Sequence, residues 1–304
     1  MQTMTFPEEC LVDIISFTTP TDVCRLSSIS RSFKMAGEAD EVWEKFLPPQ
    51  HDIDTILSQS TSASTSAAAA EFKVSKKELY LALCDKSVLI DNGKMIFFLE
   101  KWSGKKCYMI SARALYIVWA EEKSNQYWTW ICLPESRFKD VVYLESVYWI
   151  EMHGRIDMRM LSSSTLYKAY LVYKLTAEAY GLKAPVQVAT QVGHYGLGYG
   201  DLAIEIYENR QKGFLYPAKQ VSGVRSPKER VDGWLEIELG EFLCQGEDDS
   251  QVDMICVEID DLCWKKGLVV EGIEVRPERK EYCERKGKAR AKERTKGKKA
   301  MTMI

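Results

Sequence analysis

The sequence lacks any long hydrophobic run. No stretch of its 304 residues reaches the roughly 18 to 20 consecutive apolar residues that a membrane-spanning helix needs. The first twenty residues also lack the basic start and apolar centre of a signal peptide, because Glu8, Glu9 and Asp13 lie there. These absences predict an intracellular protein without a membrane span, located in the cytoplasm, the nucleus or both.

Histidine is scarce, and the cysteines are not paired in sequence. Imidazole groups come only from His51, His153 and His194, which argues against a metalloenzyme or a histidine-dependent hydrolase. The nine cysteines include no Cys-x-x-Cys pair, and their odd number fits neither a disulfide framework nor a zinc site. We expect reduced, mostly buried thiols, no metal and no cofactor.

Two common catalytic patterns are also missing. Residues 193–200 read GHYGLGYG, but no Gly-Lys-Ser/Thr follows, and the segment opens a β pattern rather than a helix, so it is not a phosphate-binding loop. Carboxylates are abundant, yet no spacing singles out two of them as a glycosidase pair. The sequence therefore favours a binding protein over an enzyme.

Charge is unevenly distributed along the chain. Residues 278–299 contain 11 Lys or Arg against four Glu, a net of +7, which leaves 30 basic against 40 acidic residues, a net of −10, in the remainder. We expect residues 278–304 to form a basic, disordered tail; a nuclear-import signal and a weak polyanion contact are the alternatives. Tyr282 is the single aromatic residue among these charges, which gives no series of stacking rings, so no specific nucleic-acid partner is expected.

Residues 5–47 have the pattern of a compact helical unit. Pro7 stands where a first-turn proline is tolerated, and Glu8 and Glu9 favour a helix N-terminus, so the first helix is expected to run to about Phe17. About forty residues cannot bury all the apolar side chains of this unit, so part of its surface is expected to need a partner. The apolar positions are Cys10, Leu11, Ile14, Ile15, Phe17, Val23, Leu26, Ile29, Val42, Trp43, Phe46 and Leu47.

This unit resembles an F-box, from Phe6-Pro7-Glu8-Glu9 through Pro20-x-Asp22-Val23-Cys24-Arg25-Leu26 to Trp43. Phe6 and Cys10 stand where leucine is usual. The resemblance implies docking on the Skp-family adaptor and, through it, on the cullin of a ubiquitin ligase. A helical subdomain that only packs on the rest of the chain is the alternative. The resemblance assigns adaptor contact to Pro7, Leu11, Ile14, Ile15, Pro20, Val23, Leu26 and Trp43.

A polar segment separates this unit from the rest of the chain. Residues 58–70 read SQSTSASTSAAAA and are poor in aromatic and branched side chains. We therefore expect an F-box at 1–50 and a linker at 51–75. Ser75 followed by Glu78 predicts a capped helix N-terminus at the start of a second domain, residues 76–277.

From Val88 onward the pattern changes to short strands separated by turn residues. Nine or ten strands with few helical patterns predict an all-β, jelly-roll-like sandwich, so the fold class is α+β multi-domain with a small all-α F-box in front. In residues 234–239 the alternation places Leu235, Ile237 and Leu239 inward and Trp234, Glu236 and Glu238 outward. The expected strands are 95–99, 107–110, 141–151, 167–175, 186–192, 203–207, 234–239, 252–259 and 268–275.

The segment 117–130, IVWAEEKSNQYWTW, concentrates three of the eight tryptophans. Its pattern predicts a hairpin of two short strands joined by a polar loop at 120–126, with Trp128 and Trp130 on one face. That face is either core or a ligand platform, and periodicity leaves both open. Glu151, Glu236 and Glu238 are candidate acceptors for ligand hydroxyls, and we take Glu238 as the candidate.

The region 76–277 resembles the phloem-lectin, Nictaba-like family. An F-box followed by this domain is a known plant arrangement. The resemblance implies a β-sandwich that binds N-acetylglucosamine oligomers or N-glycans, with Trp119 and Trp128 as sugar contacts and Trp130 as a packing residue or a support for those contacts. The matching segments are Lys101-Trp-Ser-Gly-Lys-Lys-Cys-Tyr-Met-Ile-Ser-Ala-Arg113, Tyr127-Trp128, Trp149-Ile-Glu-Met-His-Gly-Arg-Ile156, Asp232-Gly-Trp-Leu-Glu-Ile-Glu-Leu-Gly-Glu-Phe242 and Gly267-Leu-Val-Val-Glu-Gly-Ile-Glu-Val-Arg-Pro277.

Together the two resemblances predict a non-catalytic substrate receptor of a Skp-cullin-F-box ubiquitin ligase. The F-box would recruit the ligase, and the lectin-like domain would select glycans or glycoprotein targets. A stress-related carbohydrate-binding protein that acts without the ligase is the alternative, and a glycoside-processing enzyme is a third possibility.

Overall fold

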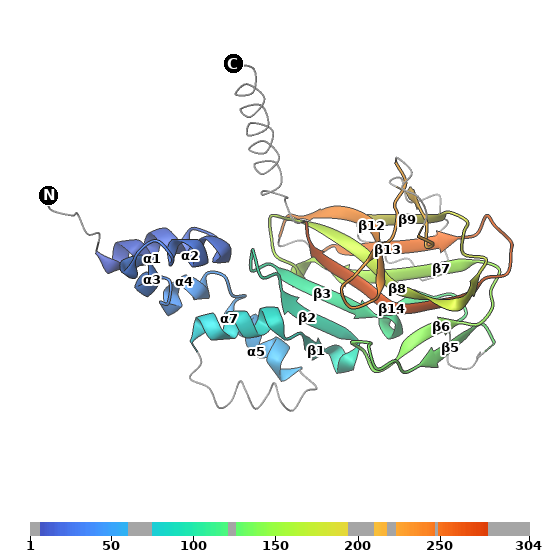
Figure 1. The fold of residues 1–304 in the computed structure, drawn as a ribbon, viewed down its shortest axis with the longest axis horizontal. Helices are drawn as coiled ribbons and strands as arrows, with labels where there is room; N and C mark the ends of the chain where they lie inside the picture. The colour runs from blue at the N-terminus through green and yellow to red at the C-terminus, as the bar shows by residue number, and fades with distance from the viewer. Residues whose placement is uncertain are drawn as a thin grey trace, which may run out of the picture.

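The computed structural model describes residues 7–59, 75–120, 126–193, 210–217, 223–246 and 249–278. A group of helices at the N-terminus leads into a large antiparallel β sandwich, and the two lie side by side along the longest axis (Figure 1). The predicted fold class is confirmed. No helix in these ranges is long and apolar enough to cross a membrane.

The N-terminal helices begin where local sequence signals place them. Thr19 accepts a hydrogen bond from the amide of Asp22, and Ser30 accepts one from the amide of Phe33, so each side chain caps the next helix. The indole of Trp43 closes the unit by donating to the carbonyl of Gly37 at 2.8 Å. The helices are α1 (Glu8–Ser16), α2 (Pro20–Leu26), α3 (Arg31–Ala36) and α4 (Asp40–Glu44).

Part of the expected linker is helical. Residues 50–58 form α5 (Gln50–Ser58), which buries Ile53 and Ile56, so the linker expected over 51–75 is corrected for 51–58. These two isoleucines are three residues apart and share one helix face, a short apolar signal that the polar composition of the segment masks. Residues 60–74 lie outside the described ranges. The predicted cap is confirmed, because Ser75 and Glu78 form a reciprocal capping box at the start of α7 (Lys76–Asp85).

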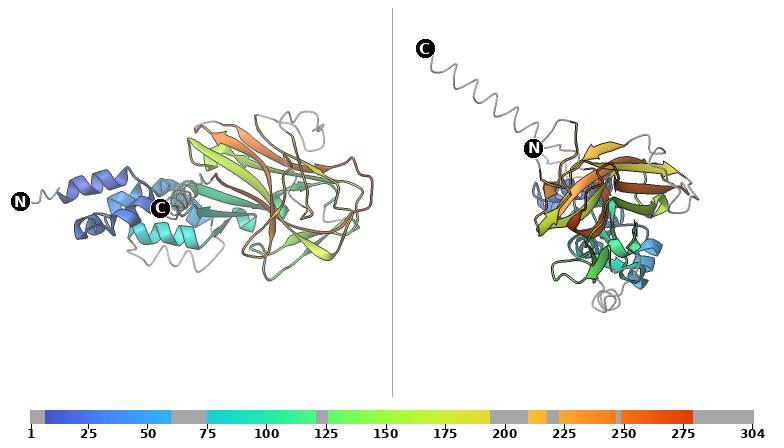
Figure 2. Two further views of the ribbon diagram at one scale, coloured as in Figure 1. Left: turned by 45° about the horizontal axis from the view of Figure 1, so that its top comes forward. Right: turned by 90° about the vertical axis from the view of Figure 1, so that its right-hand side faces the viewer.

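The helical unit and the sandwich share one continuous hydrophobic core. Tyr80 on α7 packs against Trp43 and Phe46, with ring centroids 5.1 and 6.4 Å away. Lys106 of the sandwich pairs with Asp52 of α5 at 2.7 Å and is largely shielded from solvent. Figure 2 shows α7 between the N-terminal helices and the near end of the sheets. The helical unit and the sandwich are therefore packed against each other and are not joined only by a linker.

Among the described strands, nine form one sheet and five form the other. The first sheet has the order β1-β2-β3-β14-β8-β12-β11, with β6 paired to β14 and β5 paired to β6. Its strands are β1 (Val88–Ile90), β2 (Met95–Leu99), β3 (Lys106–Ser111), β5 (Trp128–Ile131), β6 (Val141–Leu144), β8 (Thr165–Tyr180), β11 (Lys228–Glu229), β12 (Leu235–Cys244) and β14 (Lys266–Pro277). The second sheet, in the order β10-β9-β13-β7-β4, contains β4 (Tyr116–Ile117), β7 (Ile150–Asp157), β9 (Val186–Gly193), β10 (Gln211–Gly213) and β13 (Gln251–Glu258).

Most of the expected strands are present, with two differences. The single strand expected over 141–151 is two strands, β6 and β7, which belong to different sheets. Val147 lies between them in an isolated bridge to Lys265 and marks the crossing. The strand expected at 203–207 lies outside the described residues.

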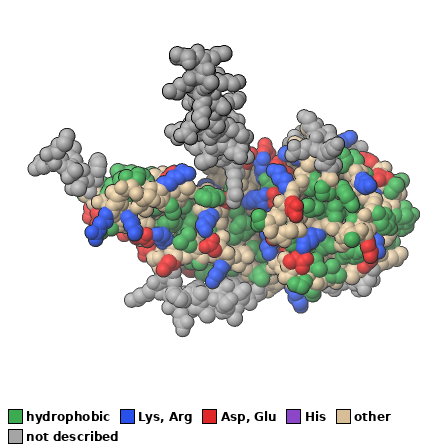
Figure 3. Space-filling model, viewed as in Figure 1, with side chains coloured by type: hydrophobic (Ala, Val, Ile, Leu, Met, Phe, Trp, Pro, Cys, Tyr) green, Lys and Arg blue, Asp and Glu red, His purple; other side chains and the backbone are tan. Residues whose placement is uncertain are grey.

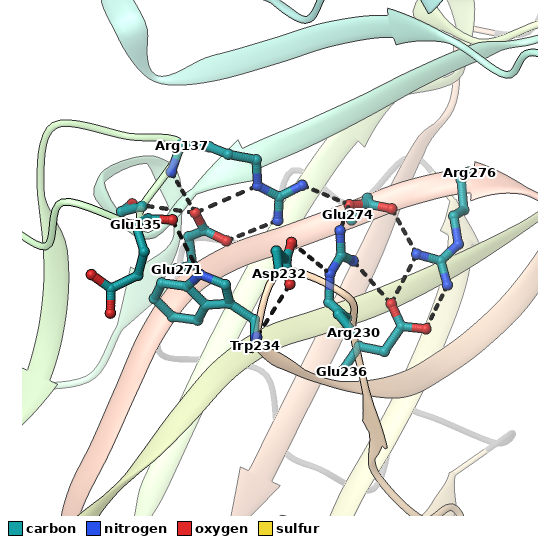
Figure 4. Close-up of polar contacts among 10 residues, drawn as sticks. Glu135, Arg137, Arg230, Asp232, Trp234, Glu236, Glu271, Glu274 and Arg276 are labelled. Atoms are coloured by element: carbon teal, nitrogen blue, oxygen red, sulfur yellow. Dashed lines mark hydrogen bonds and ion pairs between the residues drawn. The ribbon is translucent and has the colours of Figure 1, made fainter. Parts of the chain in front are cut away.

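The alternation predicted for β12 is confirmed, but its outward face does not meet solvent. Ile237 and Leu239 point into the core between the sheets, whereas Trp234 and Glu236 are buried on the opposite face. Loops around residues 133–140 and 230–234 cover that face with arginines (Figure 4). The acidic outer surface expected from the sequence is thus a buried ion-pair network.

Glu271 and Glu274 on β14 are the centre of this network. Arg137 contacts both, reaching Glu271 at 2.8 Å and Glu274 at 3.0 Å. Arg230 and Arg276 complete the surroundings of Glu274 at 3.0 and 2.7 Å. Buried carboxylates are stable only when their charge is compensated in this way, so the network pins two loops to the sheet.

The network predicts a loss of stability in acid. Burial by itself raises the pKa of Glu274, but the charges of Arg230, Arg276 and Arg137 outweigh it and hold this pKa at about 2, below the ordinary 4.5. A folded-state pKa below the unfolded one means that the ionised carboxylate stabilises the fold above about pH 4.5 and loses this effect as the pH falls towards 2. Since one pKa unit corresponds to about 1.4 kcal/mol, the contribution is about 3 kcal/mol.

Glu274→Gln is therefore expected to flatten the dependence of unfolding free energy on pH between about pH 5 and 2. Urea denaturation at a series of pH values measures this, with Glu229→Gln, on an exposed edge, as the matched control. An unchanged slope in Glu274→Gln would remove Glu274 from the acid response.

The cysteines differ in part from expectation. All eight described cysteines are free thiols, but only Cys107, Cys244 and Cys256 are buried, so the expectation of mostly buried thiols is wrong. Four of them, Cys10, Cys24, Cys132 and Cys263, are exposed. The three buried thiols lie on strands β3, β12 and β13, whereas the exposed ones lie on helices α1 and α2 or in loops.

Candidate functional site

The tryptophan-rich segment is not a hairpin. β4 pairs with β7 in one sheet, and β5 pairs with β6 in the other, so the two strands predicted to face each other lie in different sheets. Their link is made by side chains instead. The indole nitrogen of Trp128 donates to the carbonyl of Val118 at 3.0 Å, and that of Trp130 donates to the carbonyl of Ala120 at 3.3 Å. As predicted from their spacing, Trp128 and Trp130 point the same way.

Trp119 adopts an uncommon backbone conformation. Its φ angle of +64° lies in the left-handed region, which costs a residue with a side chain about 1 to 2 kcal/mol. The ring packs against Trp149 and Tyr127, with centroids 4.3 and 5.2 Å away. Strain of this kind at an aromatic side chain is typical of binding sites, where the surrounding structure holds a residue in place for a ligand.

A pocket of about 1090 Å³ opens beside Trp119. We call it the Trp119 pocket. It brings together β1, the turn at 92–94, the end of β3, the short helix η2 (Ala112–Ala114), β4 and the residues after it, β5 and the loop before β6. Its lining combines aromatic and polar side chains, as ligand pockets generally do. The lining residues include Asn92, Lys94, Ser111, Arg113, Tyr116, Trp119, Trp130, Lys139 and Asp140.

The polar groups of the pocket are held in place by their neighbours. The guanidinium of Arg113 lies 3.7 Å from the centroid of the Trp130 ring and 3.3 Å from the carboxylate of Asp140. Stacking and ion pairing together fix the Arg113 donors and the Asp140 acceptor at the wall of the pocket. Both kinds of group can replace the water that a sugar hydroxyl loses on binding.

Ser111 supplies a group that the protein leaves unsatisfied. Its side chain is 1% exposed, and its hydroxyl has no hydrogen-bond partner among the described residues. Buried polar groups without a partner are uncommon and call for an explanation. A ligand in the adjoining pocket would provide that partner only after the pocket wall shifts, because the hydroxyl oxygen is closed to solvent in this conformation.

The two predicted sugar contacts, Trp119 and Trp128, differ in whether a ligand can reach them. Trp119 lines the pocket. Trp128 is only 2% exposed and packs below the 118–120 segment, so its ring is closed to a ligand in this conformation. Trp130, which the resemblance makes a packing residue or a support for the sugar contacts, lines the pocket and stacks on Arg113. The sequence could not distinguish Trp128 from Trp130, because residues two apart on a strand point to the same face. They differ only in which other segments of the fold cover their rings.

Glu238 lies elsewhere. It stands on β12, where its carboxylate pairs with Arg225 at 2.7 Å and with Lys168 at 3.5 Å, and it is not part of the Trp119 pocket. Asp140, which the sequence did not single out, is the carboxylate that lines the pocket. It stands directly before the apolar pair that begins β6, and no local sequence signal marks it as a pocket residue.

The chemistry of the pocket suits binding by stacking and hydrogen bonding. Asp140 is the one carboxylate among its described lining residues, whereas glycosidases use two. Within the described ranges, no group of three or more His, Cys, Asp and Glu side chains is placed to hold a metal ion.

The residues assigned to adaptor contact also divide into two sets. Leu11, Ile15, Pro20, Val23 and Trp43 are buried inside the helical unit and form its core. Pro7 and Ile14 are exposed, and Leu26 is half-buried. The sequence assignment missed three exposed apolar residues beside them, Phe17, Ile29 and Met35. Phe17 and Ile29 were among the apolar positions of a unit expected to need a partner, but the F-box resemblance did not assign adaptor contact to them.

Comparisons with known proteins agree with this architecture. Residues 5–48 match the F-box-like family, and residues 105–277 match the phloem protein 2 family. The chain is 40% identical over 274 residues to F-box protein PP2-B10 of Arabidopsis thaliana, covering 90% of this chain and 93% of that protein. It is 38% identical over 290 residues to F-box protein VBF of the same plant, covering 90% and 99%.

A likeness to solved structures is weaker. The xylan-binding CBM22-1 domain of Paenibacillus barcinonensis Xyn10C covers 55% of this chain and 87% of that domain, at 13% identity and a TM-score of 0.26, which is too low to carry an argument about ligands. The family matches do carry one, because they span both parts of the chain. This chain belongs to the F-box proteins that carry a lectin-like phloem protein 2 domain.

Proposed function

We propose that this protein is the substrate-recognition subunit of a Skp-cullin-F-box ubiquitin ligase. Its helical unit docks on the Skp-family adaptor, and its sandwich holds a glycan or glycoprotein target in the Trp119 pocket. The chain itself is not catalytic and acts in the cytoplasm, the nucleus or both.

The observation that carries this proposal is the exposed apolar surface of the helical unit. Ile14 is 52% exposed and Phe17 is 90% exposed, on the helix that begins the F-box. Ile29 and Met35 add to this surface from the α2–α3 region. Figure 3 shows hydrophobic side chains gathered at the surface of this unit. Large apolar side chains left in water at this density indicate a protein partner.

The second support is the Trp119 pocket. Sugar rings present C–H groups that stack on the electron-rich faces of aromatic rings, and their hydroxyls need polar partners. The pocket offers both, with Tyr116 and Trp119 beside Arg113, Asp140 and the unsatisfied Ser111 hydroxyl. N-acetylglucosamine oligomers and N-glycans are the ligands that the family resemblance implies.

The shared core between the two parts supports a proximity mechanism. A target bound in the pocket is held at a fixed distance from the adaptor, since the helices and the sandwich are packed together through Tyr80. Fixing the target next to the ubiquitin-conjugating enzyme raises the effective concentration of its lysines. A flexible tether would give less of this effect.

Removing the Ser111 hydroxyl tests the pocket directly. Ser111→Ala is expected to leave the unfolding free energy unchanged or slightly raised, because a buried and unpartnered hydroxyl is lost. It is expected to weaken binding of an N-acetylglucosamine trimer about five- to tenfold, the effect of one hydrogen bond. Isothermal titration calorimetry and thermal unfolding measure the two effects, with Ser28→Ala, on an exposed helix end, as control. Equal affinity in both variants would place the ligand elsewhere.

The alternative function is a carbohydrate-binding protein that acts without the ligase. Size-exclusion chromatography of the full chain mixed with purified Skp-family adaptor separates the two. The ligase proposal expects a stable one-to-one complex. Separate elution of the chain and the adaptor, with glycan binding retained, would favour the alternative.

A further inference from the structure

The turn between β2 and β3 displays an exposed tryptophan next to the F-box. Residues 100–105 connect these strands at the end of the sheet that faces the helices (Figures 1 and 2). Trp102 at the tip of this turn is 55% exposed. Exposed tryptophan is costly in water and is enriched at the centres of protein interfaces.

The turn is rigid because Glu100 organises it. The carboxylate of Glu100 accepts hydrogen bonds from the amide of Trp102 at 3.0 Å and from the amide of Ser103 at 2.9 Å. It also accepts one from the hydroxyl of Ser103 at 2.8 Å. The Glu100 side chain is buried, so these bonds are shielded from competing water. The position of Trp102 is therefore fixed before any partner binds.

The turn is also fastened at three points, one on α7 and two on the helical unit. The hydroxyl of Tyr80 on α7 donates to the carbonyl of Lys101 at 3.0 Å, and the hydroxyl of Thr21 on α2 donates to the carbonyl of Trp102 at 3.3 Å. Gly104 has φ of +69°, and a Cβ atom there would meet the carbonyl oxygen of Phe46 at 2.8 Å. Only glycine allows this close approach, so the turn is wedged against the end of the F-box.

Trp102 consequently lies close to the exposed apolar surface of the F-box. Phe17 is four residues from Thr21, so their Cα atoms are at most about 14 Å apart. Thr21 contacts the backbone of Trp102 directly. A typical interface covers about 800 Å² on each partner, which is wide enough to include both Phe17 and Trp102.

We propose that the β2–β3 turn is part of the adaptor-docking surface and that Trp102 is an anchor residue of that interface. The phloem protein 2 domain thus contributes to recruitment of the ligase as well as to target binding. This inference rests on the proposed function, because its partner is the adaptor. It extends the docking surface beyond the F-box, to a residue that the F-box motif does not contain.

The test is the affinity of the full-length chain for purified Skp-family adaptor, measured by isothermal titration calorimetry. Trp102→Ala is expected to raise the dissociation constant at least about tenfold, as expected for an interface anchor. Trp264→Ala is the matched control, because Trp264 is an exposed tryptophan on the segment between β13 and β14, away from the F-box. It is expected to bind the adaptor as the wild type does.

Two further measurements distinguish loss of adaptor binding from loss of folding. Binding of an N-acetylglucosamine trimer and the thermal unfolding midpoint report on folding, and both are expected to be unchanged in Trp102→Ala. Trp102→Gln, which retains a long polar side chain, is expected to give the same loss of adaptor binding. Wild-type affinity in both Trp102 variants, while Ile14→Asp/Phe17→Asp fails to bind, would overturn this inference and leave the proposed function standing. A wild-type chain that does not bind adaptor would overturn both.

Discussion

Replacing Ile14 and Phe17 together by aspartate is expected to abolish adaptor binding, with a dissociation constant raised at least about 100-fold. Two exposed apolar side chains would become charges that the interface would have to desolvate without a partner, and each such change typically costs well over about 1.4 kcal/mol, or tenfold. Calorimetry with the full-length chain and purified adaptor measures the change. The fold is expected to be intact, because both side chains already face water.

The control has to separate docking from folding. Val231→Asp makes the same kind of change at a fully exposed residue outside the F-box and is expected to bind the adaptor normally. Leu11 is unsuitable for the test because it is buried, and a charge there would unfold the helical unit. Adaptor binding that survives Ile14→Asp/Phe17→Asp would contradict the proposed docking surface.

Trp119→Ala is expected to reduce binding of an N-acetylglucosamine trimer below detection. The substitution removes the aromatic face at the pocket and the contacts with Trp149 and Tyr127 that hold it. Loss of the stacking ring, and of the ring contacts that hold this part of the pocket in place, is expected to cost about 2 kcal/mol or more of binding free energy. This raises the dissociation constant at least about 30-fold. Adaptor binding is expected to be unchanged.

A comparison at the same position isolates the backbone strain. Trp119→Gly removes the same ring but relieves the left-handed conformation, so it is expected to be more stable than Trp119→Ala by about 1 kcal/mol in urea denaturation. Neither variant is expected to bind the trimer. Undiminished glycan binding in both would show that Trp119 is not in the site, and greater stability of the alanine variant would contradict the strain.

Local sequence signals were sufficient for the capped helices and for most strands, but not for α5, which was expected to be linker. The predicted capping box of Ser75 and Glu78 is a short-range interaction, and the structure contains it. The caps at Thr19 and Ser30 are equally local, although they were not predicted. The inward and outward alternation of β12 is similarly local, since it needs only the period of a strand.

Predictions that depended on distant residues were less successful. The segment 117–130 has the composition of a hairpin, but its two strands pair with β7 and β6, which lie later in the chain and in different sheets. That arrangement buries Trp128 and leaves Trp130 at the pocket. The period of the segment is identical in both arrangements, so the sequence could not choose between them.

The charged residues show the same limit. Glu236 was expected on a solvent-exposed acidic face, yet it pairs with Arg230 and Arg276, at 2.9 and 2.6 Å. Glu271 is compensated by Arg137, which is 134 positions earlier in the chain. Burial of carboxylates under loops from elsewhere in the chain leaves no periodic trace in the sequence.

The central claim is that one chain bridges the adaptor and a glycan. Purified adaptor should be passed over immobilised N-acetylglucosamine oligomers with and without the full-length chain, and the retained fraction measured. The adaptor is expected to be retained only with the wild-type chain, and to be lost with either Trp119→Ala or Ile14→Asp/Phe17→Asp. Adaptor that flows through in the presence of the wild-type chain would contradict a bridging role.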